Sequence, residues 1–180
     1  MDLNLRDAIA LLERTPAALD ALLRNLPDAW TMANEGGNSW NAYAIVGHLA
    51  YAERADWMPR VGMILEDGES RAFEPFDRLG QERESAGKSL PLLLDEFARL
   101  RADNLKSLTA LQLQPADLER RGTHPRFGAV TLSQLLATWT AHDLTHLHQL
   151  TRVLAHQYRS AVGPWNVFLG VLRCDGHSQA

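Results

Sequence analysis

The apolar residues of this chain recur with a helical period almost throughout. Between Leu5 and Leu26, apolar side chains return every three or four residues, as they do on the buried face of an amphipathic helix. Thr15 and Pro16 interrupt this stretch. Because proline is well tolerated in the first turn of a helix, we expect a kink or a restarted helix there. The segment 34–39, rich in glycine and asparagine, has the composition of a loop.

Three further long helices are predicted by the same periodicity. The second covers about 41–66 and is expected to bend at Pro59, because proline cannot continue the helical hydrogen bonding. The third covers about 89–111 and the fourth about 131–158. Each begins at a polar side chain that can cap a helix: Asn41, Ser89 and Thr131.

The remaining segments are read as connections. Two polar stretches that contain proline and glycine, 72–88 and 114–130, are expected to link helices. A break at Gly163 precedes a short closing helix at about 165–172, and no alternating stretch is long enough to indicate a sheet. The pattern therefore predicts an all-α fold, a four-helix bundle with a short C-terminal helix, formed by a single domain over 1–180.

Composition narrows the class of protein. The chain has 180 residues and is 46% hydrophobic, which suits one packed core and excludes a disordered chain. No apolar run approaches the length of a membrane span, and the N-terminus lacks a secretory signal, so we expect a cytoplasmic protein with no membrane partner. With 18 basic against 22 acidic residues and no basic run, we expect no nucleic-acid partner. Cys174, the single cysteine, cannot form an internal disulfide.

Two of the seven histidines share one face of the fourth helix. His142 and His146 are four residues apart, so their side chains point the same way, whereas His148 lies on roughly the opposite side. The stripe that carries the pair also carries Leu135, Trp139, Gln149 and Val153. Imidazoles buried in such a stripe need hydrogen bonds or a metal ion. Both readings, core histidines and metal ligands, stay open on this pair alone.

A third histidine favours the metal. His48 lies on the second helix among small and apolar residues, which let another helix approach closely. A lone histidine on such a face is more often structural. If the second and fourth helices are neighbours, however, His48, His142 and His146 meet at one point. Three neutral nitrogens favour Zn, Ni or a similar divalent ion and leave coordination positions open for water or substrate.

Two other motifs, a zinc-protease motif and a phosphate loop, are matched only in part. The run His142-Asp-Leu-Thr-His146 is similar to the HExxH motif of zinc proteases, but Asp143 is one methylene shorter than the catalytic glutamate and points about 100° away from His142. No third ligand follows at the required spacing. The run Ala-Gly-Lys-Ser at 86–89 lacks the first glycine of a phosphate loop, since Glu82 stands there. We read it as a loop that caps a helix.

Four segments together resemble the DinB-like superfamily of bacterial four-helix proteins. They are Trp-Asn-Ala-Tyr-Ala-Ile-Val-Gly-His-Leu at 40–49, Phe-Gly-Ala-Val-Thr-Leu at 127–132, His-Asp-Leu-Thr-His-Leu-His-Gln at 142–149, and Gly-Pro-Trp at 163–165. Each motif is short, and their order and spacing carry the resemblance. It implies an up-up-down-down bundle, a divalent metal on His48, His142 and His146, and frequent homodimers. The family name refers to induction by DNA damage and does not imply DNA binding.

The resemblance also suggests a chemistry. Related bacillithiol- and mycothiol-dependent transferases and maleylpyruvate isomerase use such a site to activate a thiol, while many members have no established reaction. We therefore expect a metal-dependent enzyme acting on a small-molecule substrate, either a thiol S-transferase with a low-molecular-weight thiol as co-substrate or a hydrolase. Three residues are candidates to orient ligands or substrate, with Gln149 ahead of Asn41 and Glu53. Trp40 and Trp139 either line a pocket or pack in the core.

Two non-enzymatic readings remain beside this one. No general base is evident, which favours a metal- or small-ligand-binding protein of the stress response that senses or sequesters its ligand. The other is a structural bundle whose histidines are core residues.

Overall fold

The first bundle helix is interrupted where the sequence predicts it. The computed structural model describes residues 2–173, so Cys174 lies outside the described residues. The helix consists of α1 (Leu5–Leu12) and α2 (Thr15–Leu23), and Pro16 lies in the first turn of α2. Proline lacks an N–H but has a helical φ, so this position restarts the helix without losing a hydrogen bond. The expected restart is confirmed.

The second bundle helix is also broken. It follows the short α3 (Asp28–Thr31) and consists of α4 (Ala42–Ala55) and α5 (Trp57–Glu66). Asn41 caps α4, since its side-chain oxygen accepts a hydrogen bond from the Ala44 N–H at 2.8 Å. The break lies at Asp56, three residues before Pro59. Proline has no N–H for the carbonyl of the residue four positions earlier, and its ring crowds that carbonyl, so the helix bends ahead of it.

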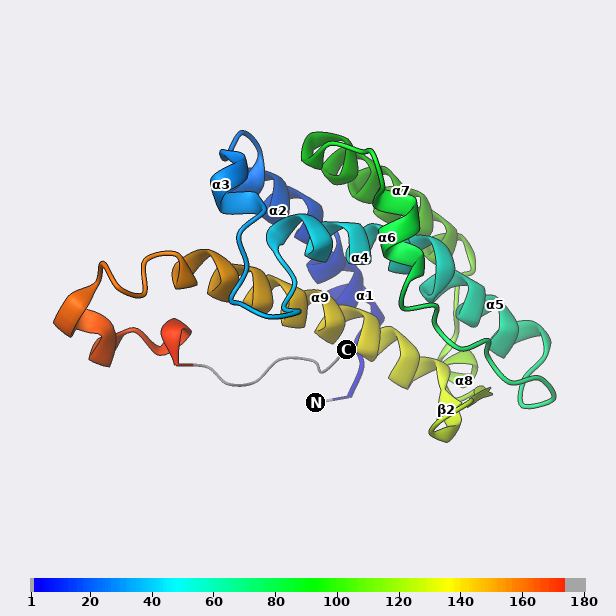
Figure 1. Ribbon diagram of the computed structural model, residues 1–180. Coiled ribbons are helices and arrows are strands. Elements are labelled where there is room, and N and C mark those ends of the chain that lie inside the picture. The colour runs from blue at the N-terminus through cyan, green and yellow to red at the C-terminus, as the bar shows by residue number, and fades with distance from the viewer. Residues whose placement is uncertain (1, 174–180) are drawn as a thin grey trace.

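The third and fourth bundle helices are unbroken. They are α7 (Leu90–Ala110) and α9 (Leu132–His156), and Ser89 and Thr131 cap them as predicted. The segment after α9 contains two 3-10 helices, η1 (Gly163–Phe168) and η2 (Gly170–Leu172), rather than the expected α-helix. This segment, orange and red in Figure 1, contacts α9 through η2 and lies apart from the other three bundle helices.

Both expected connections contain regular structure. The first contains α6 (Gly80–Ser85), and the second contains α8 (Pro115–Leu118) with a hairpin of β1 (Arg121–His124) and β2 (Gly128–Thr131). The two strands pair antiparallel, from Arg121 opposite Thr131 to His124 opposite Gly128. Strands of four residues are too short to show a convincing alternation of polar and apolar residues, which is why the sequence did not indicate them.

Side-chain contacts fix the directions of the bundle helices. Arg24, just after α2, pairs with Asp95 near the start of α7, so these helices run in opposite directions. Tyr43 in the first turn of α4 bonds to the backbone just ahead of α7, whereas Glu53 near the end of α4 contacts Asn104 further along α7, so α4 and α7 are parallel.

The fourth helix runs opposite to the second. His48 of α4 faces His142 of α9, while Glu53, later in α4, bonds to Trp139, earlier in α9. The all-α four-helix bundle is thus confirmed, but the order of directions is up-down-down-up and not up-up-down-down. The short passage through α3 turns the chain back, and the longer one through α6 returns it to the same end of the bundle (Figure 1). Within residues 2–173, no helix has the length and apolar character to cross a membrane.

The core is divided by a polar layer. One buried apolar cluster surrounds Trp57 and Trp139, and a second surrounds Phe97 and Leu150. Between the two clusters along α4, α7 and α9 lie five buried polar residues: His48, Glu53, Arg101, Asp143 and His146. This polar layer, in the middle of the bundle, contains the chemistry described next.

Candidate metal centre

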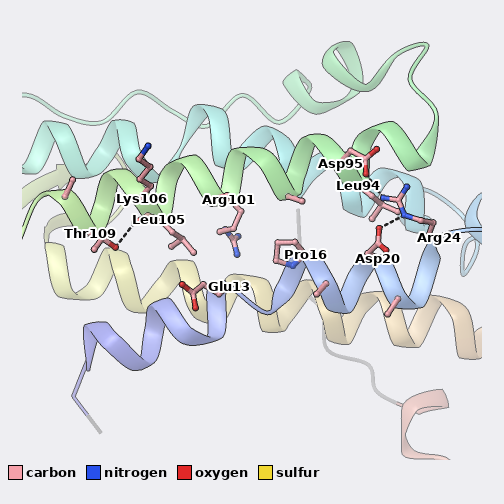
Figure 2. A pocket seen from close by; sticks show the side chains of 15 residues that line it. Glu13, Pro16, Asp20, Arg24, Leu94, Asp95, Arg101, Leu105, Lys106 and Thr109 are labelled. Atoms are coloured by element: carbon pink, nitrogen blue, oxygen red, sulfur yellow. Dashed lines mark hydrogen bonds and ion pairs between the residues drawn. The ribbon is translucent and has the colours of Figure 1, made fainter.

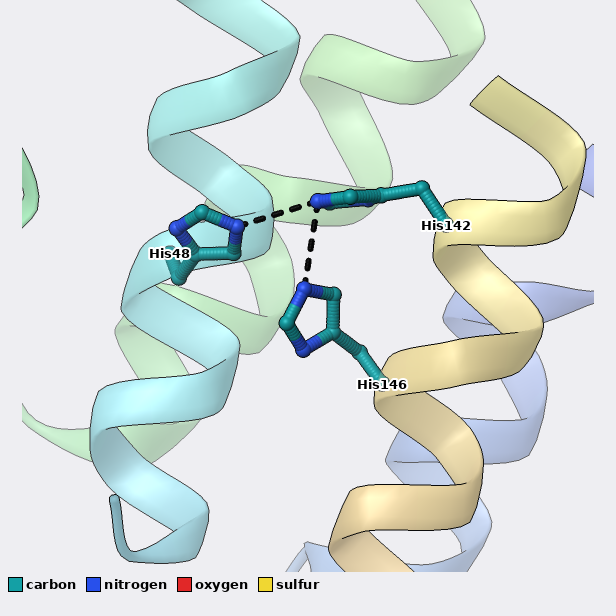
Figure 3. Close-up of side chains that lie close together, drawn as sticks. All are labelled: His48, His142 and His146. Carbon is teal, nitrogen blue, oxygen red and sulfur yellow. Dashed lines mark hydrogen bonds between the residues drawn. The ribbon is translucent and has the colours of Figure 1, made fainter. Parts of the chain in front are cut away.

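Three imidazoles converge in the polar layer. Because α4 and α9 are antiparallel neighbours, His48 lies opposite His142 and His146, which are one turn apart (Figure 3). The Nε2 atom of His142 is 3.0 Å from that of His48 and 3.1 Å from that of His146. The three potential ligand atoms all lie within 4.8 Å of one another. We call these residues the histidine triad.

Two glutamines fix the protonation of the outer imidazoles. The Nδ1 atom of His48 lies 2.7 Å from Oε1 of Gln81, and that of His146 lies 2.8 Å from Oε1 of Gln149. Since an amide oxygen only accepts, each Nδ1 carries the hydrogen and each Nε2 keeps a lone pair. The Nδ1 atom of His142 is buried and has no hydrogen-bond partner among the described residues.

All three imidazoles are neutral at physiological pH. Burial lowers the pKa of His48 to about 4, assisted by His146 and opposed by the hydrogen bond that His48 donates to Gln81. Burial, followed by the charges of the two other imidazoles, lowers the pKa of His142 to about 2. Burial also lowers the pKa of His146. A metal ligand must be deprotonated, so the triad is ready to bind without first losing protons.

The arrangement fits a divalent metal ion. The Nε2 lone pairs of His48 and His146 both point at Nε2 of His142, which carries at most one hydrogen, so a cation between the three nitrogens satisfies them better than one shared proton. Nitrogens bound to a tetrahedral ion at about 2.0–2.1 Å would be about 3.3 Å apart, close to the 3.0 and 3.1 Å that separate Nε2 of His142 from its two neighbours. Three neutral imidazoles are also the donors that borderline divalent ions prefer.

A pocket of about 930 Å³ opens over the triad. Trp40 stacks on His146 with a centroid distance of 6.0 Å, and Phe76 approaches His48 edge-on at 5.6 Å. The loop 34–39 and residues 78–82 complete the walls, so the stretch expected only to connect helices also shapes the site. Among the lining residues, Arg152 of α9 forms an ion pair with Glu35.

An ionic cluster lies beside the triad in the same layer. Arg101 is 1% exposed, and its two terminal nitrogens donate to Asp143 at 2.6 and 2.9 Å. It also donates to Glu53 at 2.8 Å, and Trp139 donates to the same Glu53 oxygen at 2.9 Å. Burial by itself would lower the pKa of Arg101, but the hydrogen bonds and charges of Asp143 and Glu53 raise it instead, so the guanidinium stays charged.

A family model described as the DinB superfamily matches residues 11–150, a range that includes the whole triad. The chain belongs to the DinB superfamily. No curated protein matches this DinB-superfamily chain.

Solved structures show the same bundle. YfiT from Bacillus subtilis, described as a probable metal-dependent hydrolase with an unusual four-helix bundle topology, is 20% identical, with a TM-score of 0.71 and 87% of each chain covered. TT2238, described as a four-helix bundle protein, is 25% identical, with a TM-score of 0.51 over 80% of this chain and 98% of that one. The likeness to YfiT shows the shared fold.

The residues expected to orient ligands separate in this DinB-superfamily chain. Gln149 bonds directly to His146, in the triad. Glu53 is part of the ionic cluster, together with Arg101 and Asp143, and no hydrogen bond joins it to the triad within residues 2–173. Asn41 caps α4 and donates to the Met32 carbonyl at 3.2 Å.

The two tryptophans separate in the same way. Trp40 lines the pocket, whereas Trp139 is fully buried in the core.

Sequence reasoning missed Gln81 and Arg101. Gln81 lies on α6, in a stretch whose glycines and charges resemble a connection, and a single sequence carries no signal for its role. Arg101 falls on the buried stripe of α7, where a charged residue was itself a detectable signal. The sequence suggested Asp143 only as a replacement for a catalytic glutamate. In the structure it is buried on α9 and pairs with Arg101.

A second groove, also of about 930 Å³, lies between α1–α2 and α7 (Figure 2). Several alanines line it, and Arg24 spans Asp20 and Asp95 at one end. Arg101 is its only lining residue that belongs to the ionic cluster, and none of its lining residues belongs to the triad.

Proposed function

We propose that this chain is a metal-dependent enzyme that activates a thiol or a water molecule for attack on a small-molecule substrate. His48, His142 and His146 are the proposed ligands of a divalent ion, with Zn or Ni the best match to three neutral imidazoles. The convergence of three neutral Nε2 atoms below an open pocket is the observation that carries the proposal.

The chain's own residues prepare the site. Gln81 and Gln149 hold two imidazoles with their lone pairs turned inward, so no reorganisation is needed on binding. Trp40 and Phe76 cover the rings on the pocket side and reduce the access of bulk water. When bound, a divalent ion supplies the positive charge that lowers the pKa of a thiol or water to near neutrality.

The form of the site favours catalysis over a structural role. Structural zinc sites are closed by four protein ligands, whereas catalytic sites have three and keep a position for water or substrate. The triad offers three, and the pocket above it has the volume of a typical small-molecule site. The description of YfiT as a probable metal-dependent hydrolase supports the water-activating version. The family resemblance supports the thiol-dependent version.

The second candidate is a non-enzymatic metal- or small-ligand-binding protein of the stress response. One observation favours it: of the two carboxylates that line the pocket, Glu35 is paired with Arg152 and Glu82 is exposed. Neither is positioned as an evident general base.

Metal analysis and turnover test the proposal together. Purified chain should contain about one equivalent of divalent metal, and His146→Ala should contain far less. Loaded protein is then incubated with low-molecular-weight thiols and monochlorobimane, or with activated esters, beside His146→Ala. Turnover above the variant supports the enzyme. Metal binding without turnover on either substrate class favours the second candidate, and absence of metal binding overturns both.

A further inference from the structure

The ionic cluster has an unbalanced charge. Glu53, Arg101 and Asp143 are 2%, 1% and 2% exposed, so all three are sealed from water. Two carboxylates share a single guanidinium, and the cluster therefore carries a net charge of −1 when all three are ionised. An excess charge in the interior is costly unless an opposite charge lies nearby.

Hydrogen bonding keeps the negative charge in place. Asp143 accepts two bonds from Arg101. Glu53 accepts three, from Arg101, Trp139 and the side chain of Asn104. Every neighbour donates toward these oxygens, as ionised carboxylates require. The layer is thus built around two charged carboxylates and not around a protonated one.

The ionic cluster and the histidine triad are in physical contact through aromatic rings. Trp139, which bonds to Glu53, stacks on Trp57 with centroids 5.7 Å apart. Trp57 in turn lies edge-on to His142 at 5.1 Å. Asp143 also directly follows His142 on α9.

Glu53, Arg101 and Asp143 are sealed from water beside the triad, so their charges act on it across a dry interior, where electrostatic interactions are strong.

We propose that the excess negative charge of Glu53 and Asp143 is the electrostatic counterpart of the divalent ion on the triad. The inference rests on the proposed metal site and adds a function for residues that do not touch the metal. Three neutral imidazoles leave a dication with its full charge in the interior, and the ionic cluster halves that net charge. The carboxylates thereby raise the affinity of the site for divalent cations.

Glu53→Gln tests the charge with little change in shape. The dissociation constant for Zn²⁺ is measured by competition with a chromophoric chelator, at low and at high ionic strength. We expect the variant to bind about tenfold more weakly. The difference should persist at high salt, because a buried charge is poorly screened. Unfolding of the metal-free proteins is measured in parallel, so that a loss of fold is separated from a loss of affinity.

A charge swap supplies the rescue. Asn104 contacts Glu53 at 3.0 Å, so Glu53→Gln combined with Asn104→Asp returns the net charge of the ionic cluster to −1 at a neighbouring atom. Zinc affinity should recover to within about threefold of the wild type. Glu96→Gln is the matched control, because Glu96 is also ion-paired, with Arg54 and Lys88, but does not line the pocket.

The outcomes separate the two proposals. A wild-type chain that binds no divalent metal overturns the proposed function, and this inference with it. A wild type that binds zinc beside a folded Glu53→Gln of equal affinity overturns the inference alone. A weakened single variant that the charge swap does not restore also overturns it, since hydrogen bonding and not charge would then be the cause. If Glu53→Gln does not fold, Asp143→Asn makes the same charge change from α9 and is judged by the same affinities.

Discussion

The two parts of the polar layer solve the problem of burying polar groups in different ways. The ionic cluster contains full charges, and Arg101 satisfies Asp143 and Glu53 with hydrogen bonds in a sealed space. The triad contains three neutral imidazoles whose Nε2 atoms converge below an open pocket. The carboxylates of the ionic cluster receive hydrogen bonds from neighbouring side chains and keep one negative charge in excess, whereas the three converging Nε2 atoms cannot all satisfy one another and can all bind one cation. The comparison indicates which part of the layer binds a ligand.

The largest expected effect comes from removing the counter-ion of the ionic cluster. Arg101→Met leaves Glu53 and Asp143 buried without their counter-ion and should lower the free energy of unfolding by about 3–5 kcal/mol. Arg99→Met on the same helix is the control, because Arg99 and Asp103 form an exposed ion pair and should contribute less than about 1 kcal/mol. Urea denaturation of the metal-free proteins measures both. Equal stabilities for the two variants would show that the ionic cluster does not stabilise the fold.

Removing a triad member should lower metal affinity strongly and the stability of the metal-free protein only slightly. His142→Ala takes away the nitrogen that lies close to both others, so we expect affinity for Zn²⁺ to fall more than a hundredfold, about 3 kcal/mol. The metal-free protein should lose little stability by comparison, because no hydrogen bond to Nδ1 is lost.

His148→Ala is the control for this prediction, since His148 is exposed on the other side of α9. It should bind one equivalent of metal as the wild type does, and titration calorimetry compares the two variants. A His142→Ala protein that still binds one equivalent tightly would contradict the proposed ligand set.

The features that could be predicted from the sequence are those set by residues close together in the chain. Caps at Asn41, Ser89 and Thr131 were predicted at the correct residues, because a cap bonds to backbone within three positions. His142 and His146 are paired by helix geometry alone. The meeting with His48 and the direction of the helices depend on which helices are neighbours. That is a property of the whole chain, and the expected directions were wrong.

The ionic cluster shows the limit more clearly. Arg101 lies 48 positions from Glu53 and 42 from Asp143, so no periodicity within one helix links them. Each alone reads as an ordinary charged helical residue. Only packing three helices around one point turns them into a unit.

Acid should destabilise the metal-free protein through the buried histidines of the triad. Burial lowers the pKa of His48 to about 4 and that of His142 to about 2, from an ordinary value of 6.5. As pH falls below 6.5, the unfolded chain binds protons that the folded chain does not. The free energy of unfolding of the metal-free protein should therefore fall, with a slope of up to about 1.4 kcal/mol per pH unit for each histidine.

Urea unfolding at intervals between pH 4.5 and 7.5 measures this slope. His48→Gln should flatten it by one proton, whereas His148→Gln should not change it. A wild-type stability that is constant over this range would mean that the buried histidines do not resist protonation.

The smallest expected effect concerns the residues that orient the triad. Gln81→Leu removes the acceptor that fixes Nδ1 of His48 while keeping a side chain of similar size, and we expect about tenfold weaker binding of Zn²⁺. Gln81→Glu keeps an acceptor and should retain most of the affinity. Gln157→Leu is the matched control, because the Gln157 side chain bonds to the Val153 carbonyl beyond the triad. If Gln81→Leu and Gln157→Leu bind equally well, packing and not the glutamine holds the imidazole in place.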